Sequence, residues 1–179
     1  TAETPLVGMH SDEIFREEDL PIKYVAFSPC FRKEAGAAGQ RDKGLKRVHQ
    51  FHKVELFVIC TPEQSEQLHE EMVHQVKRLL KEFAKTFDED MFEIREIELE
   101  PHDRAPWSNK TVDIEITAIN GEWLEVSSIS NTGDNQSKIA QIRYKPKKGG
   151  KNVKCHLLNG SGVALPRLKM AMGIIEGDK

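Results

Sequence analysis

The stretch that decides the fold runs from Ile22 to Cys60 and reads 22-IKYVAFSPCFRKEAGAAGQRDKGLKRVHQFHKVELFVIC-60. Its two ends, residues 22–31 and 47–60, are rich in aromatic and apolar residues and are therefore predicted to be strands. The segment between them is rich in glycine, alanine and charged residues, which is typical of a turn. Together the three parts predict a long antiparallel hairpin.

Side-chain parity on this hairpin groups residues that suit a nucleotide and an amino acid. Phe51, Lys53 and Glu55 share one face of the return strand, because alternate residues of a strand point the same way. Arg32 and Glu34 share parity on the entry side. An aromatic ring suits a base, a guanidinium suits a phosphate or carboxylate, and a carboxylate suits an ammonium. A solvated ladder of cross-strand ion pairs is the alternative that the pattern leaves open.

The segment after Cys60 changes to a helical period. Apolar residues recur every three or four positions and define one helical face, formed by Leu68, Met72, Val76, Leu79, Leu80, Phe83 and Phe87. The start is supplied by Thr61-Pro62-Glu63-Gln64, with a capping threonine, a proline at the first helical position and a glutamine that completes the capping box. A scaffold helix packed on a sheet is the simplest interpretation.

Alternation of apolar and polar residues predicts further strands. The alternating segments are FEIREIELE at 92–100, VDIEITAI at 112–119 and WLEVSSIS at 123–130. The tip KPKKGGK at 145–151 is predicted to join IAQIRYKP and NVKCHLL as another hairpin, and LPRLKMAMGIIEG to form a short helix from near Pro166 to Gly177. This order predicts the α+β class, with one mostly antiparallel β-sheet flanked by helices.

Length and composition set outer limits on the function. The 179 residues suit one domain, and a net charge of −3 gives no strong overall attraction for nucleic acid. Cys30, Cys60 and Cys155 form no CxxC pair, which favours a reducing compartment such as the cytoplasm or a mitochondrial or plastid matrix. No apolar run approaches the roughly 20 residues of a membrane span, so no membrane partner is expected. The chain opens at Thr1 without an initiator methionine, and we expect its native N-terminus to lie upstream.

Four segments resemble, in the same order, the seryl-tRNA synthetases, which belong to the class II aminoacyl-tRNA synthetases. They are TAE at 1–3, FRKEAGAAGQRDKGLKRVHQFHKVE at 31–55, EVSSISNTGDNQS at 125–137 and LNGSGVALPR at 158–167. The second closely resembles motif 2 of that family, and the likeness extends over nearly the whole chain. The resemblance implies a class II catalytic-domain fold over residues 1–179.

The resemblance also implies a serine-binding site. The TAE segment helps to bind serine in the family, Glu55 would hold the serine ammonium, and Asn159 and Ser161 would close over the side chain. The full set implied for serine is Thr1, Ala2, Glu3, Arg32, Glu55, Asn159 and Ser161.

An ATP site with Mg²⁺ is implied in the same way. Arg32 would bridge the serine carboxylate and the α-phosphate, Phe51 would stack on adenine, and Arg167 would meet the γ-phosphate. The implied ATP contacts are Arg32, Lys33, Glu34, Val48, His49, Gln50, Phe51, Glu125, Val126, Ser127, Ser128 and Arg167. Arg32, Glu125 and Arg167 would be catalytic, and Glu125 and Ser128 would be the Mg²⁺ ligands.

Plain strand parity gives an alternative for these two metal ligands. In a regular strand Glu125 and Ser127 share an outward face, whereas Ser128 lies opposite.

The activity that the resemblance implies is ATP-dependent formation of seryl-adenylate from L-serine, followed by transfer to the 3′ end of tRNA(Ser), by a homodimer. A non-aminoacylating paralogue acting as a binding or regulatory module is the alternative. The family's motif 1 and N-terminal tRNA-binding arm are not found in this chain, which we expect to be part of a catalytic domain. Residues 101–110, PHDRAPWSNK, are atypical of the family. The KPKKGGK tip either contacts RNA phosphate or is a solvated loop.

Overall fold

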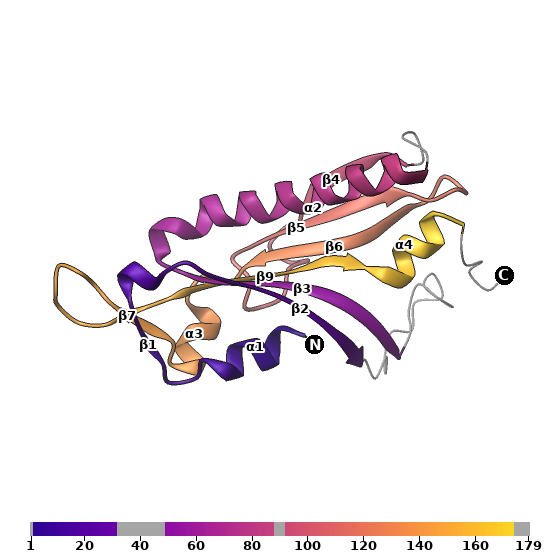
Figure 1. The fold of residues 1–179 in the computed structure, drawn as a ribbon. Coiled ribbons are helices and arrows are strands. Elements are labelled where there is room, and N and C mark those ends of the chain that lie inside the picture. The colour runs from indigo at the N-terminus through magenta and orange to yellow at the C-terminus, as the bar shows by residue number, and fades with distance from the viewer. Residues whose placement is uncertain (1, 32–48, 88–91, 174–179) are drawn as a thin grey trace.

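The computed structural model of the chain describes residues 2–31, 49–87 and 92–173. Its main layer is a six-stranded antiparallel sheet (Figure 1). In spatial order the strands are β2 (Ile22–Phe31), β3 (Gln50–Cys60), β9 (His156–Ala164), β6 (Trp123–Asn131), β5 (Lys110–Thr117) and β4 (Ile94–Glu98). The predicted α+β class is therefore confirmed.

The hairpin that the sequence predicts is formed by β2 and β3. The two strands pair antiparallel from Ile22 with Ile59 to Phe31 with Gln50. The connecting residues 32–48 lie outside the described part of the chain, and with them the predicted positions of Arg32 and Glu34.

One face of the sheet is covered by α2 (Ser65–Phe87), which begins after the short 3₁₀ turn η3 (Pro62–Gln64) (Figure 1). The capping box between Thr61 and Gln64 is present as predicted. Leu79 is 55% exposed, so its predicted place in the buried face is wrong. Leu80 is fully buried, and neighbouring residues of a helix point about 100° apart, so both cannot face the sheet. The buried face is made by Leu68, Met72, Val73, Val76, Leu80 and Ala84.

The opposite side carries a second, smaller sheet, of which the sequence predicted the lysine-rich hairpin but not its separation from the main sheet. It contains β1 (Ile14–Arg16), β7 (Arg143–Lys145) and β8 (Val153–Lys154), and it lies with α1 (Glu3–Met9) and α3 (Asn135–Ala140) (Figure 1). Strands of two or three residues are too short to show an alternating pattern, which explains why one sheet was expected. The predicted strand character of residues 139–140 is also wrong, because they end α3.

A second apolar core joins this side to the main sheet. It is separate from the core under α2 and consists of Leu6, Phe15, Leu20, Phe57, Ile59, Ile142, Tyr144, Cys155 and Leu157. Phe57 and Ile59 belong to β3, and Leu6 belongs to α1. The face of β3 that carries Phe57 is therefore the face on which α1 packs.

The chain ends its described part with α4 (Leu165–Ala171), which follows directly on β9 (Figure 1). The prediction that this helix continues to Gly177 is wrong. Gly173 has a φ of +65°, a conformation that glycine adopts without steric cost and that commonly terminates a helix.

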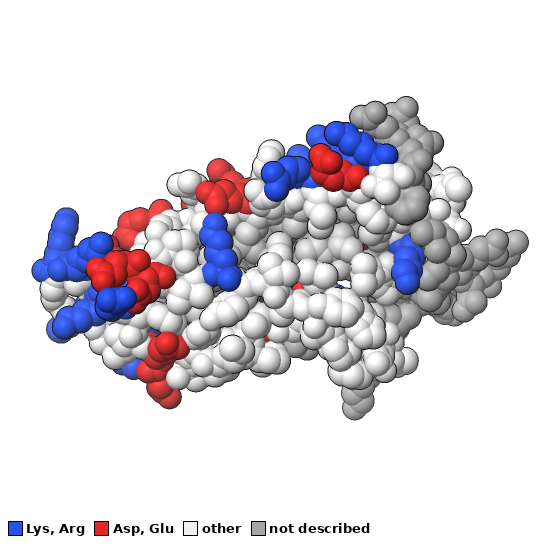
Figure 2. All heavy atoms as spheres, in the orientation of Figure 1, with Lys and Arg blue, Asp and Glu red and all other residues white. Residues whose placement is uncertain are grey.

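Charged side chains gather at the end of the molecule that carries the β7–β8 loop and along α2, whereas the surface between them is largely uncharged (Figure 2). At the loop, the backbone N–H of Lys147 donates to Glu17 Oε2 at 2.7 Å, and Lys147 Nζ lies 3.8 Å from Glu18 Oε2. The predicted hairpin around the lysine-rich tip is confirmed by the antiparallel pairing of β7 with β8. None of the described helices combines the length and apolar character that a membrane crossing requires.

Candidate active site

A β-bulge in β6 determines how the predicted metal ligands lie. Ile114 of β5 pairs with Ser127 of β6. The next residue of β5, Glu115, pairs with Glu125, so Val126 is an extra residue in β6. Val126 is completely buried and packs in the apolar core under α2. Any contact of Val126 with a ligand in front of the sheet would therefore come from its backbone.

The bulge places Glu125 and Ser128 on the same face of the sheet. Ser128 pairs with Asp113, just as Glu125 pairs with Glu115. Asp113 and Glu115 lie two positions apart in a regular strand, so they share a face, and their partners Ser128 and Glu125 share it too. The alternative in which Ser128 lies opposite Glu125 is therefore wrong.

A second bulge, in β9, lies beside the residues predicted to bind serine. Glu55 of β3 pairs with Ser161, which therefore points to the same face. The preceding residue, Val54, pairs with Val163, so Gly162 is the extra residue. A Cβ added at Gly162 would lie 3.1 Å from Val54 Cγ1, which is a tight contact.

Strand pairing joins these groups into one surface. Asn159 pairs with Phe57 of β3, which lies two positions from Glu55 and so shares its face. Asn159 also pairs with Ser130 of β6, which shares the face of Ser128 for the same reason. We call this surface the site face. It lies on the side of α1, opposite α2, and it carries Glu55, Asn159, Ser161, Glu125, Ser128 and Asp113.

Glu55 is the most deeply buried acid of the site face, with 1% of its surface exposed. Lys53 Nζ lies 2.8 Å from Glu55 Oε2, yet this oxygen accepts no well-formed hydrogen bond from any residue the structure describes. Burial raises the pKa of Glu55 to about 7, although Lys53 opposes the shift, while Glu3 adds to it. Because burial outweighs the effect of Lys53, the Glu55 carboxylate is suited to an additional cationic ligand.

Arg167 and Glu125 are in direct contact at the other side of the face. Arg167 Nη1 donates to the backbone carbonyl of Glu125 at 2.9 Å and lies 3.1 Å from Glu125 Oε1. Arg167 is in the first turn of α4, as the sequence predicts. The guanidinium remains about a quarter exposed, with 26% of its side-chain surface accessible, so it can also meet a ligand.

Asp113 is an acid of this site that the sequence reasoning missed. Its burial raises the pKa to about 6; a hydrogen bond with the Ser128 side chain and the charge of Arg167 oppose the shift, while Glu125 and Glu115 add to it. Asp113 Oδ1 is buried and has no hydrogen-bond partner within the described ranges. One aspartate in an alternating strand gives no signal in the sequence, because its role depends on the strand beside it.

Ala2 and Glu3, two other predicted serine contacts, lie on the same side of the main sheet as the site face. Ala2 is buried and Glu3 begins α1, which contacts β3. Asn159 Nδ2 lies 3.5 Å from Gln136 Oε1 of α3. The structure thus brings together Ala2, Glu3, Glu55, Asn159 and Ser161.

The predicted ATP contacts are described only in part. His49 and Gln50 lie at the exposed start of β3, and Phe51 shares the face of Lys53 and Glu55. Thr1, Arg32, Lys33, Glu34 and Val48 lie outside the described residues.

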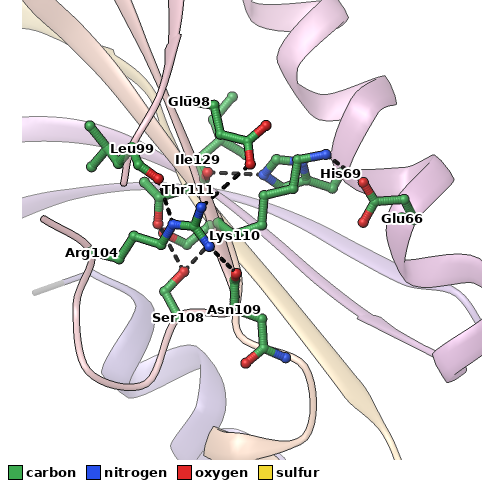
Figure 3. Close-up of polar contacts among 11 residues, drawn as sticks. Glu66, His69, Glu98, Leu99, Arg104, Ser108, Asn109, Lys110, Thr111 and Ile129 are labelled. Carbon is green, nitrogen blue, oxygen red and sulfur yellow. Dashed lines mark hydrogen bonds and ion pairs between the residues drawn. The ribbon is translucent and has the colours of Figure 1, made fainter. Parts of the chain in front are cut away.

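The atypical segment 101–110 takes part in a polar cluster apart from the predicted site residues (Figure 3). The Arg104 guanidinium holds the β4–β5 loop by donating to the carbonyls of Leu99, at 2.6 Å, and of Asn109. His69 Nε2 of α2 donates to the carbonyl of Ile129 at 3.0 Å, and burial lowers the His69 pKa. In the described part of the chain, no three His, Cys, Asp or Glu side chains gather as a metal-binding group.

Comparison with known proteins identifies the family to which this sheet belongs. Residues 1–174 match the model of the tRNA synthetase class II core domain (G, H, P, S and T). The serine–tRNA ligase of Chlamydia abortus is 46% identical over 173 residues, which are 96% of this chain and 39% of that protein. The chain thus spans about two-fifths of the length of such curated relatives.

Solved structures give the same result. The seryl-tRNA synthetase of Pyrococcus horikoshii complexed with ATP aligns with a TM-score of 0.86 and 41% identity, covering 96% of this chain and 37% of that one. The cytoplasmic serine–tRNA ligase of Naegleria fowleri in complex with AMP aligns with a TM-score of 0.83 and 30% identity, covering 100% of this chain and 41% of that one. With nearly its whole length matched in sequence and its sheet matched in space, the chain belongs to the family of class II tRNA synthetase core domains.

Proposed function

We propose that this chain is the catalytic core of a seryl-tRNA synthetase. The protein that contains it would activate L-serine with ATP to seryl-adenylate and transfer the seryl group to the 3′ end of tRNA(Ser). The observation that carries the proposal is the site face, on which the buried carboxylate of Glu55, paired with Lys53, lies on the same surface as the Glu125–Ser128 pair. The similarity to serine–tRNA ligases supports it.

Serine would bind with its ammonium at Glu55. A cation at this carboxylate favours the ionised form and so counteracts the burial that raises its pKa to about 7. Asn159 and Ser161 would surround the serine hydroxyl, together with Glu3. A site with polar groups arranged around a hydroxyl rejects alanine, because those groups would then lose their partner.

ATP would lie along the start of β3 and across to β6 and α4. Phe51 would stack on the adenine, and Arg167 would bind the γ-phosphate. The serine carboxylate would attack the α-phosphorus, forming the acyl phosphate bond as pyrophosphate leaves; the terminal ribose hydroxyl of the tRNA would then attack the acyl carbon as AMP leaves. Neither step needs a protein nucleophile, so catalysis would come from alignment and from neutralising phosphate charge.

Mg²⁺ is the implied metal, and the residues present fit it. Glu125 and Ser128 offer hard oxygen donors from one face, and beside them Asp113 presents a buried oxygen that has no hydrogen-bond partner among the described residues. Bound there with ATP, Mg²⁺ would neutralise phosphate charge. Arg167 would exchange its contact with Glu125 for the γ-phosphate, which would free the carboxylate for the metal.

A non-aminoacylating paralogue is the other candidate, but nothing on the site face favours it. Homodimer formation and action in the cytoplasm or an organelle matrix stay predictions.

The test is serine-dependent exchange of labelled pyrophosphate into ATP by the full-length protein. We expect L-serine to support exchange and L-alanine and L-threonine to support far less. A protein that binds ATP but exchanges no pyrophosphate with any of the three would contradict the proposal.

A further inference from the structure

Strand β6 carries Glu125 and Ser128, and strand β9 carries Asn159 and Ser161; the two strands stop pairing with each other within the site face. β6 and β9 pair from Asn131 with Leu158 to Ile129 with Gly160. Continuing this register would place Ser128 opposite Ser161, but the described pairing ends one residue earlier. Beyond this point the two strands separate towards the end where α4 begins (Figure 1).

Both bulges lie directly beyond this end of the pairing. Val126 is the extra residue on the β5 side of β6, and Gly162 is the extra residue on the β3 side of β9. Each bulge disrupts the ladder of backbone hydrogen bonds and bends its strand. Beyond the end of the pairing, the register between the strand carrying Glu125 and the strand carrying Ser161 depends on side chains: Arg167, at the start of α4, bonds to Glu125, and Val126 and Val163 share the core under α2.

A direct hydrogen bond between the two strands themselves comes from Ser127. The Ser127 hydroxyl donates a hydrogen bond to the backbone carbonyl of Ser161, and Ser127 is 1% exposed. Ser127 lies between Glu125 and Ser128, and Ser161 pairs with Glu55. The bond thus ties the strand of the metal ligands to the strand of the serine contacts, at the point where the backbone ladder no longer does so.

We propose that Ser127 is a positioning residue that holds the serine-binding strand β9 in register with the metal- and ATP-binding strand β6. The inference rests on the proposed function. Its consequence is a misalignment of the serine carboxylate with the α-phosphorus when the bond is lost, because each substrate keeps the contacts of its own strand. A misplacement of about 1 Å costs a reaction up to about 100-fold in rate.

The chain offers a matched control in Ser137. Its hydroxyl also donates to a carbonyl, that of Cys155 at 2.5 Å just before β9, and Ser137 is completely buried. Ser137 lies in α3 and belongs to no predicted binding set. Ser127→Ala and Ser137→Ala therefore remove the same chemical group at similar burial, one at the site and one away from it.

The experiment measures steady-state pyrophosphate exchange by the full-length protein and its two variants. We expect Ser127→Ala to lower kcat by about 10- to 100-fold while both KM values stay within about threefold, and Ser137→Ala to keep kcat within about twofold. Equal kcat values for the two variants would overturn the proposal, as would a Ser127→Ala defect confined to the KM for serine. If Ser127→Ala fails to melt cooperatively, Ser127→Cys, which keeps a side chain of similar shape with a weaker donor, replaces it under the same criteria.

Amide hydrogen exchange gives a second result that does not depend on activity. Ser127→Ala should speed exchange in residues 125–128 and 159–163, whereas Ser137→Ala should leave both segments as in the wild type. Unchanged protection in Ser127→Ala would overturn the link. Absence of serine-dependent exchange in the wild type, with the altered protection still present in Ser127→Ala, would instead count against the proposed function alone.

Discussion

Glu125 and Ser128 point to the same face of the main sheet although three positions separate them along β6, because the bulge at Val126 takes up one residue. A regular strand would have placed them on opposite faces. Bulges are common beside active sites because they redirect a side chain without breaking the sheet. Here the bulge brings the two proposed oxygen ligands to one face, although a regular strand with their spacing would separate them.

Replacing Glu55 by glutamine should remove serine recognition and stabilise the ligand-free protein at alkaline pH. The folded protein holds the Glu55 proton up to a pKa of about 7, whereas an unfolded chain releases it near the ordinary value of 4.5. Folding stability is therefore highest below about pH 4.5 and falls as the pH rises towards 7. The total loss is about 3 kcal/mol, since each unit of pKa difference corresponds to about 1.4 kcal/mol. Denaturant titrations between about pH 4 and 8 should show this decline in the wild type and a flatter profile in Glu55→Gln.

The control for Glu55→Gln is Glu100→Gln, at an exposed position after β4. It should reproduce the wild-type pH profile and the wild-type KM for serine. A wild-type profile in Glu55→Gln would show that Glu55 is not the buried acid that the structure indicates.

Replacing Arg167 by alanine should reduce pyrophosphate exchange by at least about 100-fold, because the cation beside the developing phosphate charge is lost. Arg167→Lys should recover little, since the lysine ammonium lacks the planar fork with which a guanidinium binds phosphate oxygens. Lys169→Ala, at an exposed position of the same helix, is the matched loss of a positive charge and should leave exchange unchanged. Exchange by Arg167→Ala at the rate of Lys169→Ala would refute the assignment.

Replacing Asp113 by asparagine should raise the Mg²⁺ concentration required for half-maximal exchange by about 10-fold, because the charge that faces the metal site is lost while a hydrogen bond to Ser128 can remain. Direct Mn²⁺ binding, followed by electron paramagnetic resonance in the presence of ATP, should weaken in parallel. Glu115→Gln is the comparison, because Glu115 is already paired with Arg95 Nε at 2.7 Å. Equal metal dependence of the two variants would argue against a role for Asp113.

Replacing Gly160 by alanine should destabilise the protein by about 1–3 kcal/mol and lower exchange. A Cβ there would lie 2.8 Å from Ile129 Cγ1 and 3.1 Å from Ile129 Cα, so β6 and β9 would have to separate where their pairing ends. Gly8→Ala in α1 meets nothing within 4 Å and should be neutral or stabilising by up to about 1 kcal/mol. Thermal unfolding of both variants measures the difference, and a Gly160→Ala protein as stable as Gly8→Ala would contradict the expectation.

The sequence by itself determined the elements whose pattern is local and long. The β2–β3 hairpin, the capped helix α2 and the alternating strands β5 and β6 follow from the period of apolar residues over eight or more positions. Local pattern predicted the β7–β8 hairpin but not β1 or the separation of these short strands into a second sheet, and it failed for Leu79, whose neighbour Leu80 takes the buried position.

Only the tertiary structure decided how the candidate site is assembled. The bulges at Val126 and Gly162, the free buried oxygen of Asp113 and the bond from Ser127 to Ser161 all depend on which strand lies beside which. A single sequence can show which residue types are present in each strand, and its resemblance to a family can suggest their roles. It cannot show the register between strands that are distant in the chain, because that register is set by packing and hydrogen bonding across the sheet.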